Sequence, residues 1–291
     1  MSTTYLVTGG AGVIGSHLAD ALLAAGHRAV ILDDLSTGDR ARLADAWPSP
    51  RLRFVRGSAL DERLVGELLS RCDGAVHAAL SVDVRVLADA AHRLGRPLLS
   101  VEGEGAGGAE GSGGAVGPSV TGVRIFGEVV GPRRVPAYGT VLGGFAARAV
   151  AGEVVGVAEA AEVVEVASDG GPRRRFTHVT DVVDALVRLL AAGGAAGRVL
   201  DLAGTEGVTD AELAALVARR ADTGAPPGPT SPPDPTSLPD TATALSELTG
   251  WVPRFTLDRL VDAALAEACR VASSLVPGRR AEELAPVQPL S

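Results

Sequence analysis

Apolar positions at the start of the chain follow the spacing of a strand, then a helix, then a second strand. Residues 5–8 form a short apolar run, and a glycine-rich segment follows directly. Apolar residues then recur at helical spacing between residues 16 and 25, and Gly26 ends the run. A second apolar run, residues 29–32, leads into two aspartates. The pattern predicts a β-α-β unit.

The same alternation continues along the chain and predicts an α/β fold. Further strands are expected at residues 53–56, 74–79, 97–101, 121–126, 163–166 and 199–202. Helices are expected at residues 61–71, 84–94, 141–151, 181–190, 210–220 and 257–272. Because repeated crossovers of this length join parallel strands, we expect a Rossmann-type, doubly wound parallel sheet with helices on both faces. Ligands should bind at the carboxyl ends of its strands.

Two segments interrupt this alternation. Residues 102–117 hold eight glycines in sixteen positions and predict a loop where a parallel sheet normally has a crossover helix. Residues 226–239 hold seven prolines in fourteen positions and predict a linker or surface loop.

The glycine-rich segment at residues 9–15, GGAGVIG, lies between the first strand and the first helix. In this context it predicts a dinucleotide site, because glycines let backbone N–H groups approach a diphosphate at a helix N-terminus. Asp33, at the end of the second strand, favours NAD by accepting from the ribose 2′-OH and repelling a 2′-phosphate. Ser36, Thr37 and Arg40 follow in a loop that suits a 2′-phosphate, so NADP(H) stays open.

Composition narrows the class of protein. The 291 residues are 46% hydrophobic and 21% charged, as expected of a globular chain. No run of 18 apolar residues and no signal-peptide pattern occurs, so we expect a cytoplasmic protein without a membrane partner. A net charge of −8 argues against nucleic acid as a partner. Cys72 and Cys269 are expected to be reduced, buried thiols, and no metal site is expected.

One absence limits the chemistry further. The Lys+Arg total is 27 and all 27 are arginine, so the chain has no lysine, and its two tyrosines are Tyr5 and Tyr138. Mechanisms that need a lysine ammonium, or a tyrosine paired with one, are excluded.

Several segments carry a family resemblance: YLVTGGAGVIGSHL, VILDDLSTG, AVHAAL, VRIFGEVVGPR, AYGTVLGGFAARAVAGE, RRRFTHVTDVVDAL and LSELTGWVPR. With them, residues 5 to 254 resemble the extended short-chain dehydrogenases/reductases, which include nucleotide-sugar epimerases and dehydratases. The resemblance implies a Rossmann core over residues 1–135 that is completed by residues 175–205. It also implies a substrate-binding subdomain formed by residues 136–174 and 206–275, with residues 276–291 as a tail.

The resemblance also implies the contacts of each ligand. Cofactor contacts are expected from Gly9, Gly12, Val13, Ile14, Asp33, Asp34, Ser36, Thr37, Arg40, Ser58, Ala59, Ala78, Ala79, Leu80, Ser100 and Ile125. Substrate contacts are expected from Val101, Glu102, Gly127, Glu128, Tyr138 and Phe176.

The chain departs from the family in its proton-transfer residues. Family enzymes use a Ser/Thr with a Tyr-x-x-x-Lys pair, in which the lysine lowers the tyrosine pKa. Here the corresponding stretch is the glycine-rich loop, which has neither residue. No catalytic acid is therefore assigned, and the candidates that remain for the role are Ser100, Tyr138 and Glu102. Ser58 stands where the family has an adenine-contacting Asp, and Gly127 where it has an Asn.

Three further positions have competing interpretations. Tyr138 has Leu142 four residues on instead of a lysine, so a role in lining the substrate pocket is favoured over catalysis. His178 matches a family position at the domain junction, where a hydrogen-bonded structural role is favoured. Residues 173–175 are three arginines that either clamp a phosphate or form a solvated turn.

A family member with its glycine turn but without its acid/base pair resembles the angucyclinone-type aromatic polyketide ketoreductases of antibiotic biosynthesis, the group that includes the simocyclinone enzyme. The resemblance implies NADPH-dependent reduction of a ketone on a small-molecule aromatic substrate, with NADH open because of Asp33. Two alternatives remain: an inactive dinucleotide-binding scaffold or sensor, and a nucleotide-sugar epimerase or dehydratase. The sequence does not decide the oligomeric state.

Overall fold

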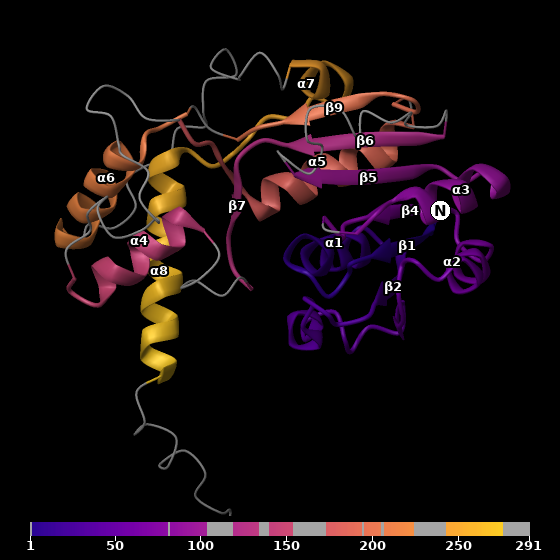
Figure 1. The fold of residues 1–291 in the computed structure, drawn as a ribbon, viewed down its shortest axis with the longest axis horizontal. Helices are drawn as coiled ribbons and strands as arrows, with labels where there is room; N and C mark the ends of the chain where they lie inside the picture. The colour runs from indigo at the N-terminus through magenta and orange to yellow at the C-terminus, as the bar shows by residue number, and fades with distance from the viewer. Residues whose placement is uncertain are drawn as a thin grey trace, which may run out of the picture.

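The computed structural model describes residues 2–80, 82–103, 119–133, 140–153, 173–193, 195–204, 207–223 and 243–275. Seven described strands form one sheet, and every pairing between them is parallel (Figure 1). Their order across the sheet is β3 (Leu52–Arg56), β2 (Arg28–Asp33), β1 (Thr4–Thr8), β4 (Gly74–His77), β5 (Leu98–Gly103), β6 (Val120–Ile125) and β9 (Val199–Leu202). The predicted α/β parallel sheet is confirmed.

Helices cover both faces of this sheet. Helices α1 (Val13–Ala24) and α5 (Val179–Ala192) share a core with Val7 of β1, whereas α2 (Glu62–Leu69) and α3 (Arg85–Leu94) share one with Leu6. Leu6 and Val7 are both fully buried although they are neighbours, because successive strand residues point to opposite faces. This explains the continuous apolar runs in the sequence.

A second lobe stands beside the sheet (Figure 1). Its helices α4 (Val141–Val150), α6 (Asp210–Thr223) and α8 (Leu257–Leu275) pack around the buried Phe145 and Leu260. The two-stranded parallel sheet of β7 (Glu128–Val130) and β8 (Phe176–His178) lies between this lobe and the large sheet. Helix α7 (Thr243–Thr249) packs against α5 and β9.

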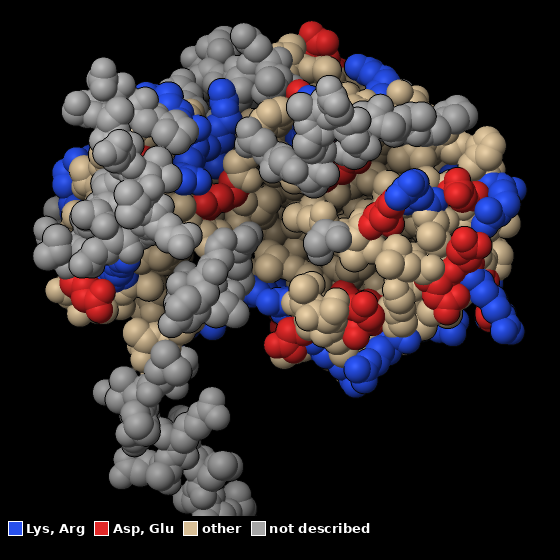
Figure 2. Space-filling view, viewed as in Figure 1, with Lys and Arg blue, Asp and Glu red and all other residues tan. Residues whose placement is uncertain are grey.

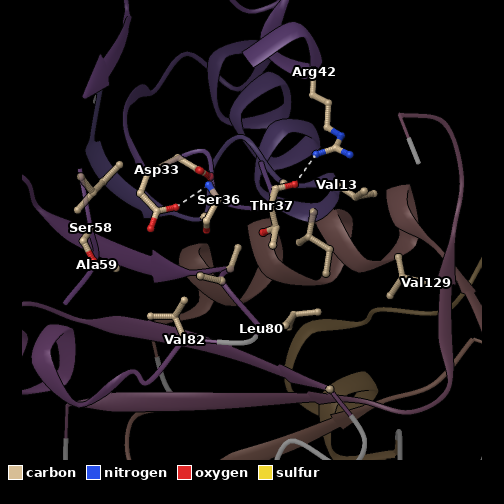
Figure 3. Close-up of a pocket in the computed structure, with 18 of the residues that line it drawn as sticks. Val13, Asp33, Ser36, Thr37, Arg42, Ser58, Ala59, Leu80, Val82 and Val129 are labelled. Carbon is tan, nitrogen blue, oxygen red and sulfur yellow. Dashed lines mark hydrogen bonds between the residues drawn. The ribbon is translucent and has the colours of Figure 1, made fainter. Parts of the chain in front are cut away.

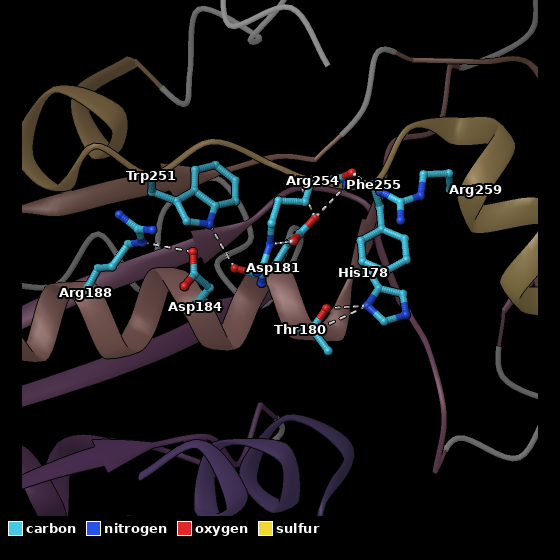
Figure 4. A network of polar contacts seen from close by, with 9 residues as sticks. All are labelled: His178, Thr180, Asp181, Asp184, Arg188, Trp251, Arg254, Phe255 and Arg259. Carbon is cyan, nitrogen blue, oxygen red and sulfur yellow. Dashed lines mark hydrogen bonds and ion pairs between the residues drawn. The ribbon is translucent and has the colours of Figure 1, made fainter. Parts of the chain in front are cut away.

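The lobes are joined where β8 runs directly into α5 (Figure 4). The ring of His178 stacks on Phe255, with 3.8 Å between their centroids. The buried carboxylate of Asp181 accepts hydrogen bonds from the backbone nitrogens of Arg254 (2.9 Å) and Phe255 (3.1 Å). The indole N–H of Trp251 donates to the Asp181 carbonyl at 2.9 Å. These contacts fasten the segment before α8 to α5, and His178 has the structural role expected of it.

Short elements are where the structure differs from the pattern. The strands β7 and β8, helix α7 and the 3₁₀ helix η1 (Arg40–Leu43) were not expected, since elements this short show no periodicity. Strand β4 ends at His77 instead of residue 79, because the chain there turns away from the sheet after its last pairing with Thr8.

Other expectations lie wholly or largely outside the described residues: the strand at 163–166, the glycine-rich loop, the proline-rich segment and the tail. The division into core and substrate-binding subdomain stays a prediction.

The two cysteines, the charges on one face and the character of the helices bear on the expectations from composition. Cys72 is buried, which raises the pKa of its thiol to about 11, but Cys269 on α8 is exposed, so the expectation of burial was wrong there. The middle of the face in Figure 2, between the two lobes, carries mostly side chains without charge, whereas acidic and basic residues mingle around it. Among the described helices, none has the length and apolar character to cross a membrane.

Candidate functional site

The glycine turn after β1 packs backbone against backbone. Gly9 has a φ of +69°, and its N–H donates to the Leu32 carbonyl at 3.0 Å. A Cβ at Gly9 would lie 2.7 Å from the Ala79 nitrogen, and one at Gly15 would lie 2.3 Å from the Gly9 carbonyl oxygen. Only glycine fits both positions. The turn therefore brings the start of α1 close to the loop after β4.

Helix α1 begins at this turn with its N-terminal N–H groups free of side-chain caps. Gly12 is its N-cap in extended conformation, and no acidic residue occupies the first turn. Gly12 has room above it, since a Cβ there would meet only the Gly9 carbonyl oxygen at 3.1 Å. A helix N-terminus with uncapped N–H groups and no side chain in front of it suits an anion such as a diphosphate. The residues present thus fit a dinucleotide.

A cavity of about 590 Å³ opens in front of the glycine turn, at the carboxyl ends of the strands (Figure 3). This volume is in the range of small-molecule sites. The predicted residues that line it are Gly9, Gly12, Val13, Ile14, Asp33, Asp34, Ser36, Thr37, Ser58, Ala59, Ala78, Ala79, Leu80, Ile125, Gly127 and Glu128. The structure thus brings most of the predicted cofactor-binding residues and two of the predicted substrate-binding residues together around one cavity.

Asp33 organises one end of the cavity. Asp33 as a residue is 7% exposed, and its carboxylate accepts hydrogen bonds from the Ala11 nitrogen (2.9 Å) and the Leu35 nitrogen (2.8 Å). One bond holds the glycine turn, and the other holds Leu35 at a φ of 65°. Each carboxylate oxygen keeps a second lone pair, so Asp33 can still accept from a ribose hydroxyl.

Gly127 and Glu128 shape the other end. A Cβ at Gly127, where φ is +79°, would lie 2.0 Å from the Arg175 carbonyl oxygen, so the β7–β8 connection approaches too closely for another residue. The carboxylate oxygens of Glu128 each lie 3.0 Å from the Val141 nitrogen, at the start of α4. Glu128 therefore ties the second lobe to the cavity wall.

Four buried or displaced residues of the predicted set do not line the cavity. Ser100, Val101 and Phe176 are at most 2% exposed and pack inside the protein, and the Ser100 hydroxyl has no hydrogen-bond partner in the described structure. The guanidinium of Arg40 lies 4.1 Å above the ring of Trp47 instead of facing the cavity.

Glu102 and Tyr138 complete the predicted set. Glu102 lies opposite Arg124 in the β5–β6 register and outside the cavity lining, and its carboxyl pKa is raised because the effect of burial outweighs that of the Arg124 charge. Tyr138 lies outside the described residues.

The arginine run also has a structural explanation where it is described. Arg174 pairs with Asp210 at 2.7 Å and Arg173 with Glu212 at 3.4 Å, so both bind the start of α6. Neither lines the cavity.

Seven further residues line the cavity without having been predicted from the sequence: Leu32, Arg42, Gly57, Leu60, Val82, Gly103 and Val129. Of these, Arg42 is the charged residue, and its only signal is the turn sequence GDRAR. The ionisable residues of the lining are Asp33, Asp34, Arg42 and Glu128. None of the described lining residues is a tyrosine, lysine, histidine or cysteine, so Asp33, Asp34 and Glu128 are the side chains of the described lining that could act as a general acid or base.

These features define an α/β protein with a dinucleotide-type cavity at the carboxyl edge of a parallel sheet. A model of the NAD dependent epimerase/dehydratase family matches residues 5–94 and 113–203, so the chain belongs to that family.

Curated relatives match over a shorter stretch. One is a UDP-glucose 4-epimerase of Lacticaseibacillus casei, 44% identical over 82 residues, or 27% of this chain and 23% of the relative. Another is a dTDP-glucose 4,6-dehydratase of Actinoplanes sp., 39% identical over 87 residues, or 27% of each chain. The match thus spans only about a quarter of the length of these relatives.

Solved structures with the same fold cover most of the chain. A UDP-glucose 4-epimerase of Thermotoga maritima superposes with a TM-score of 0.66 at 22% identity, covering 92% of this chain and 99% of the other. A dTDP-glucose 4,6-dehydratase of Bacillus anthracis in complex with NAD gives 0.67 at 17% identity, covering 91% and 96%.

Proposed function

We propose that this protein is an NAD(P)H-dependent ketoreductase that reduces a carbonyl of an angucyclinone-type aromatic polyketide in antibiotic biosynthesis. The observation that carries the proposal is a dinucleotide-type cavity in a chain without lysine. An epimerase or dehydratase must take a proton from a sugar hydroxyl and then return a hydride, so it depends on an acid/base pair. Reduction of a ketone needs only a hydride and one proton.

Each part of the cavity has a binding role in this proposal. The glycine turn and the start of α1 bind the diphosphate, and Asp33 accepts a hydrogen bond from the adenosine ribose. Ala78, Ala79, Ile125 and Gly127 leave an uncharged space for the nicotinamide. A reduced nicotinamide supplies the hydride. The resemblance to aromatic polyketide ketoreductases favours NADPH, whereas the NAD dependent family and the Asp33 carboxylate favour NADH, so both cofactors are included in every assay.

The proton comes from the substrate in this proposal. Hydride addition leaves negative charge on the ketone oxygen, which a proton must neutralise. Glu128 is the acid at that end of the described lining, and its carboxylate already accepts from the Val141 N–H. A phenol beside the ketone donates its proton to that oxygen, and solvent water reprotonates the phenolate after the product has left the cavity. The protein orients the two partners and excludes water, which makes the transfer effectively intramolecular.

A matched pair of substrates tests this function. One aromatic ketone keeps its neighbouring phenol and the other carries it as a methyl ether, and each is assayed for oxidation of NADPH and NADH at saturation. We expect the phenol to be reduced and the ether to be slower by about 10²–10⁴, the usual contribution of a general acid. Equal rates would place the proton source elsewhere. If neither ketone is reduced by protein that binds the dinucleotide, the reductase proposal is wrong.

Nucleotide-sugar chemistry is the second candidate. It is favoured by the similarity of part of the chain to a UDP-glucose 4-epimerase and a dTDP-glucose 4,6-dehydratase. It predicts a thermal shift with UDP-glucose or dTDP-glucose and an altered sugar among the products. A protein that binds dinucleotide but turns over neither class of substrate would instead be a scaffold or sensor.

A further inference from the structure

Arg42 is a cation of the cavity wall (Figure 3). It belongs to η1, and its Nε donates to the Arg133 carbonyl at 2.8 Å. One terminal nitrogen donates to the carbonyls of Ala11 (3.2 Å) and Thr37 (3.3 Å). All three of these partners are uncharged carbonyl oxygens. They hold the guanidinium in place without neutralising its charge.

The neighbouring Arg133 shows the contrast. One terminal nitrogen of Arg133 lies 2.7 Å from Asp20 and 2.6 Å from Asp45, so two carboxylates compensate its charge. A guanidinium has five N–H donors, and the three carbonyl contacts of Arg42 use at most three of them. Its second terminal nitrogen therefore keeps donors without an acceptor among the described residues.

The carbonyl contacts also fix where these donors lie. Ala11 belongs to the glycine turn, its N–H is held by Asp33, and α1 begins two residues later. The Arg42 guanidinium is thus fastened beside the anion-binding start of α1. Because the protein has already positioned it, little side-chain entropy remains to be lost when an anion binds.

We propose that Arg42 is a phosphate ligand, which donates its remaining N–H groups to a phosphate of the dinucleotide. Its contact with the glycine turn indicates the diphosphate bridge, and the 2′-phosphate of NADPH is the other source of the same chemistry. The inference rests on the dinucleotide binding of the proposed function and is independent of ketone reduction.

The test compares Arg42→Gln with Arg40→Gln, a matched control on the same 3₁₀ helix. Arg40 stacks on Trp47 outside the cavity, so its loss should leave affinity near the wild-type value. Calorimetric titration with NADH and NADPH should show a loss of about 10- to 100-fold for Arg42→Gln, as expected for a charge-assisted hydrogen bond. The loss should shrink as salt is added, and Arg42→Lys should recover part of the affinity.

Adenosine, which carries no phosphate, separates a phosphate contact from a distorted loop. Its affinity should be the same in wild type and Arg42→Gln. Equal losses for NADH and NADPH identify the diphosphate, and a loss confined to NADPH identifies the 2′-phosphate; both support the inference. Unchanged dinucleotide affinity, or an equal loss for adenosine, overturns it. If the wild-type protein binds no dinucleotide, the proposed function fails as well.

Discussion

Among single residues, Gly12 and Gly15 differ in what a side chain would cost. A Cβ at Gly12 meets one atom at 3.1 Å, whereas a Cβ at Gly15 meets the Gly9 oxygen at 2.3 Å and the Gly10 Cα at 2.6 Å. We therefore expect Gly12→Val to fold and to lose dinucleotide affinity, because its methyl groups occupy the diphosphate position. Gly15→Val should lose stability, because the turn itself must move. Thermal unfolding and NADH titration measure the two effects.

Gly66 of α2 gives the control, since a Cβ there meets nothing within 4 Å. Gly66→Ala should bind NADH normally and be more stable by about 1 kcal/mol, the helix-propensity difference. A Gly12→Val protein with wild-type affinity would show that the diphosphate does not approach this turn.

Ser100 allows a second prediction about a single side chain. Its hydroxyl is buried, has no partner in the described structure and does not line the cavity. Ser100→Ala should therefore leave stability unchanged or raise it by up to about 1 kcal/mol, because an unsatisfied polar group is removed. Turnover of the aromatic ketone should stay within about tenfold of wild type, and the same holds for Tyr138→Phe. A drop of about 10²-fold or more in folded protein would identify a general acid.

The sequence predicted site residues best where backbone geometry decides their place. The glycine turn and Asp33 follow from the β-α-β unit, whose strand ends meet at one edge of the sheet. Arg40 and Arg42 are only two residues apart in a turn that has no periodicity, and the structure directs one to Trp47 and the other to the cavity. The directions of these two side chains depend on tertiary packing, so they cannot be predicted from the local sequence pattern.

At the scale of elements, α5 carries two aspartates in opposite environments. Asp181 is buried and accepts two backbone N–H bonds from the segment before α8, whereas Asp184 forms an ion pair with Arg188 on the helix surface. Asp181→Ala leaves these N–H groups without an acceptor and should cost about 2–4 kcal/mol of unfolding free energy. Asp184→Ala should cost no more than about 0.5 kcal/mol. Urea unfolding measures both.

If the two substitutions cost the same, the hydrogen bonds of Asp181 do not hold the segment. NADH affinity is measured for the control as well. A loss of affinity in Asp184→Ala would show that this substitution disturbs the cavity and is not a valid control.

The elements found by periodicity are those long enough to express it. Helices α1, α2 and α3 and their neighbouring strands were predicted within a few residues, because each buries a continuous face against the sheet. Strands β7 and β8 have three residues each and pair only with each other. Their pairing brings segments more than 40 residues apart together, as from Glu128 to Phe176, and no local pattern records such a contact.

At the scale of the whole molecule, the join between the lobes makes stability depend on pH. His178 is buried beneath Phe255, and its Nδ1 lies 2.7 Å from the Thr180 hydroxyl. Burial lowers the pKa of His178 from 6.5 to about 4, and burial also lowers the pKa of His17 and of His77. Between pH 4 and pH 6.5, His178 therefore binds a proton in the unfolded chain but not in the folded chain.

Stability should therefore be full above pH 6.5 and fall as the pH drops toward 4, with His178 contributing about 3 kcal/mol of the loss. Asp181 acts in the opposite sense, because burial raises its pKa and the protonated form then favours the fold. The measurement is the urea midpoint as a function of pH for wild type, His178→Gln and His92→Gln, whose histidine is exposed on α3. The acid loss should shrink in His178→Gln and persist in His92→Gln; equal profiles for all three would mean that His178 takes up no extra proton on unfolding.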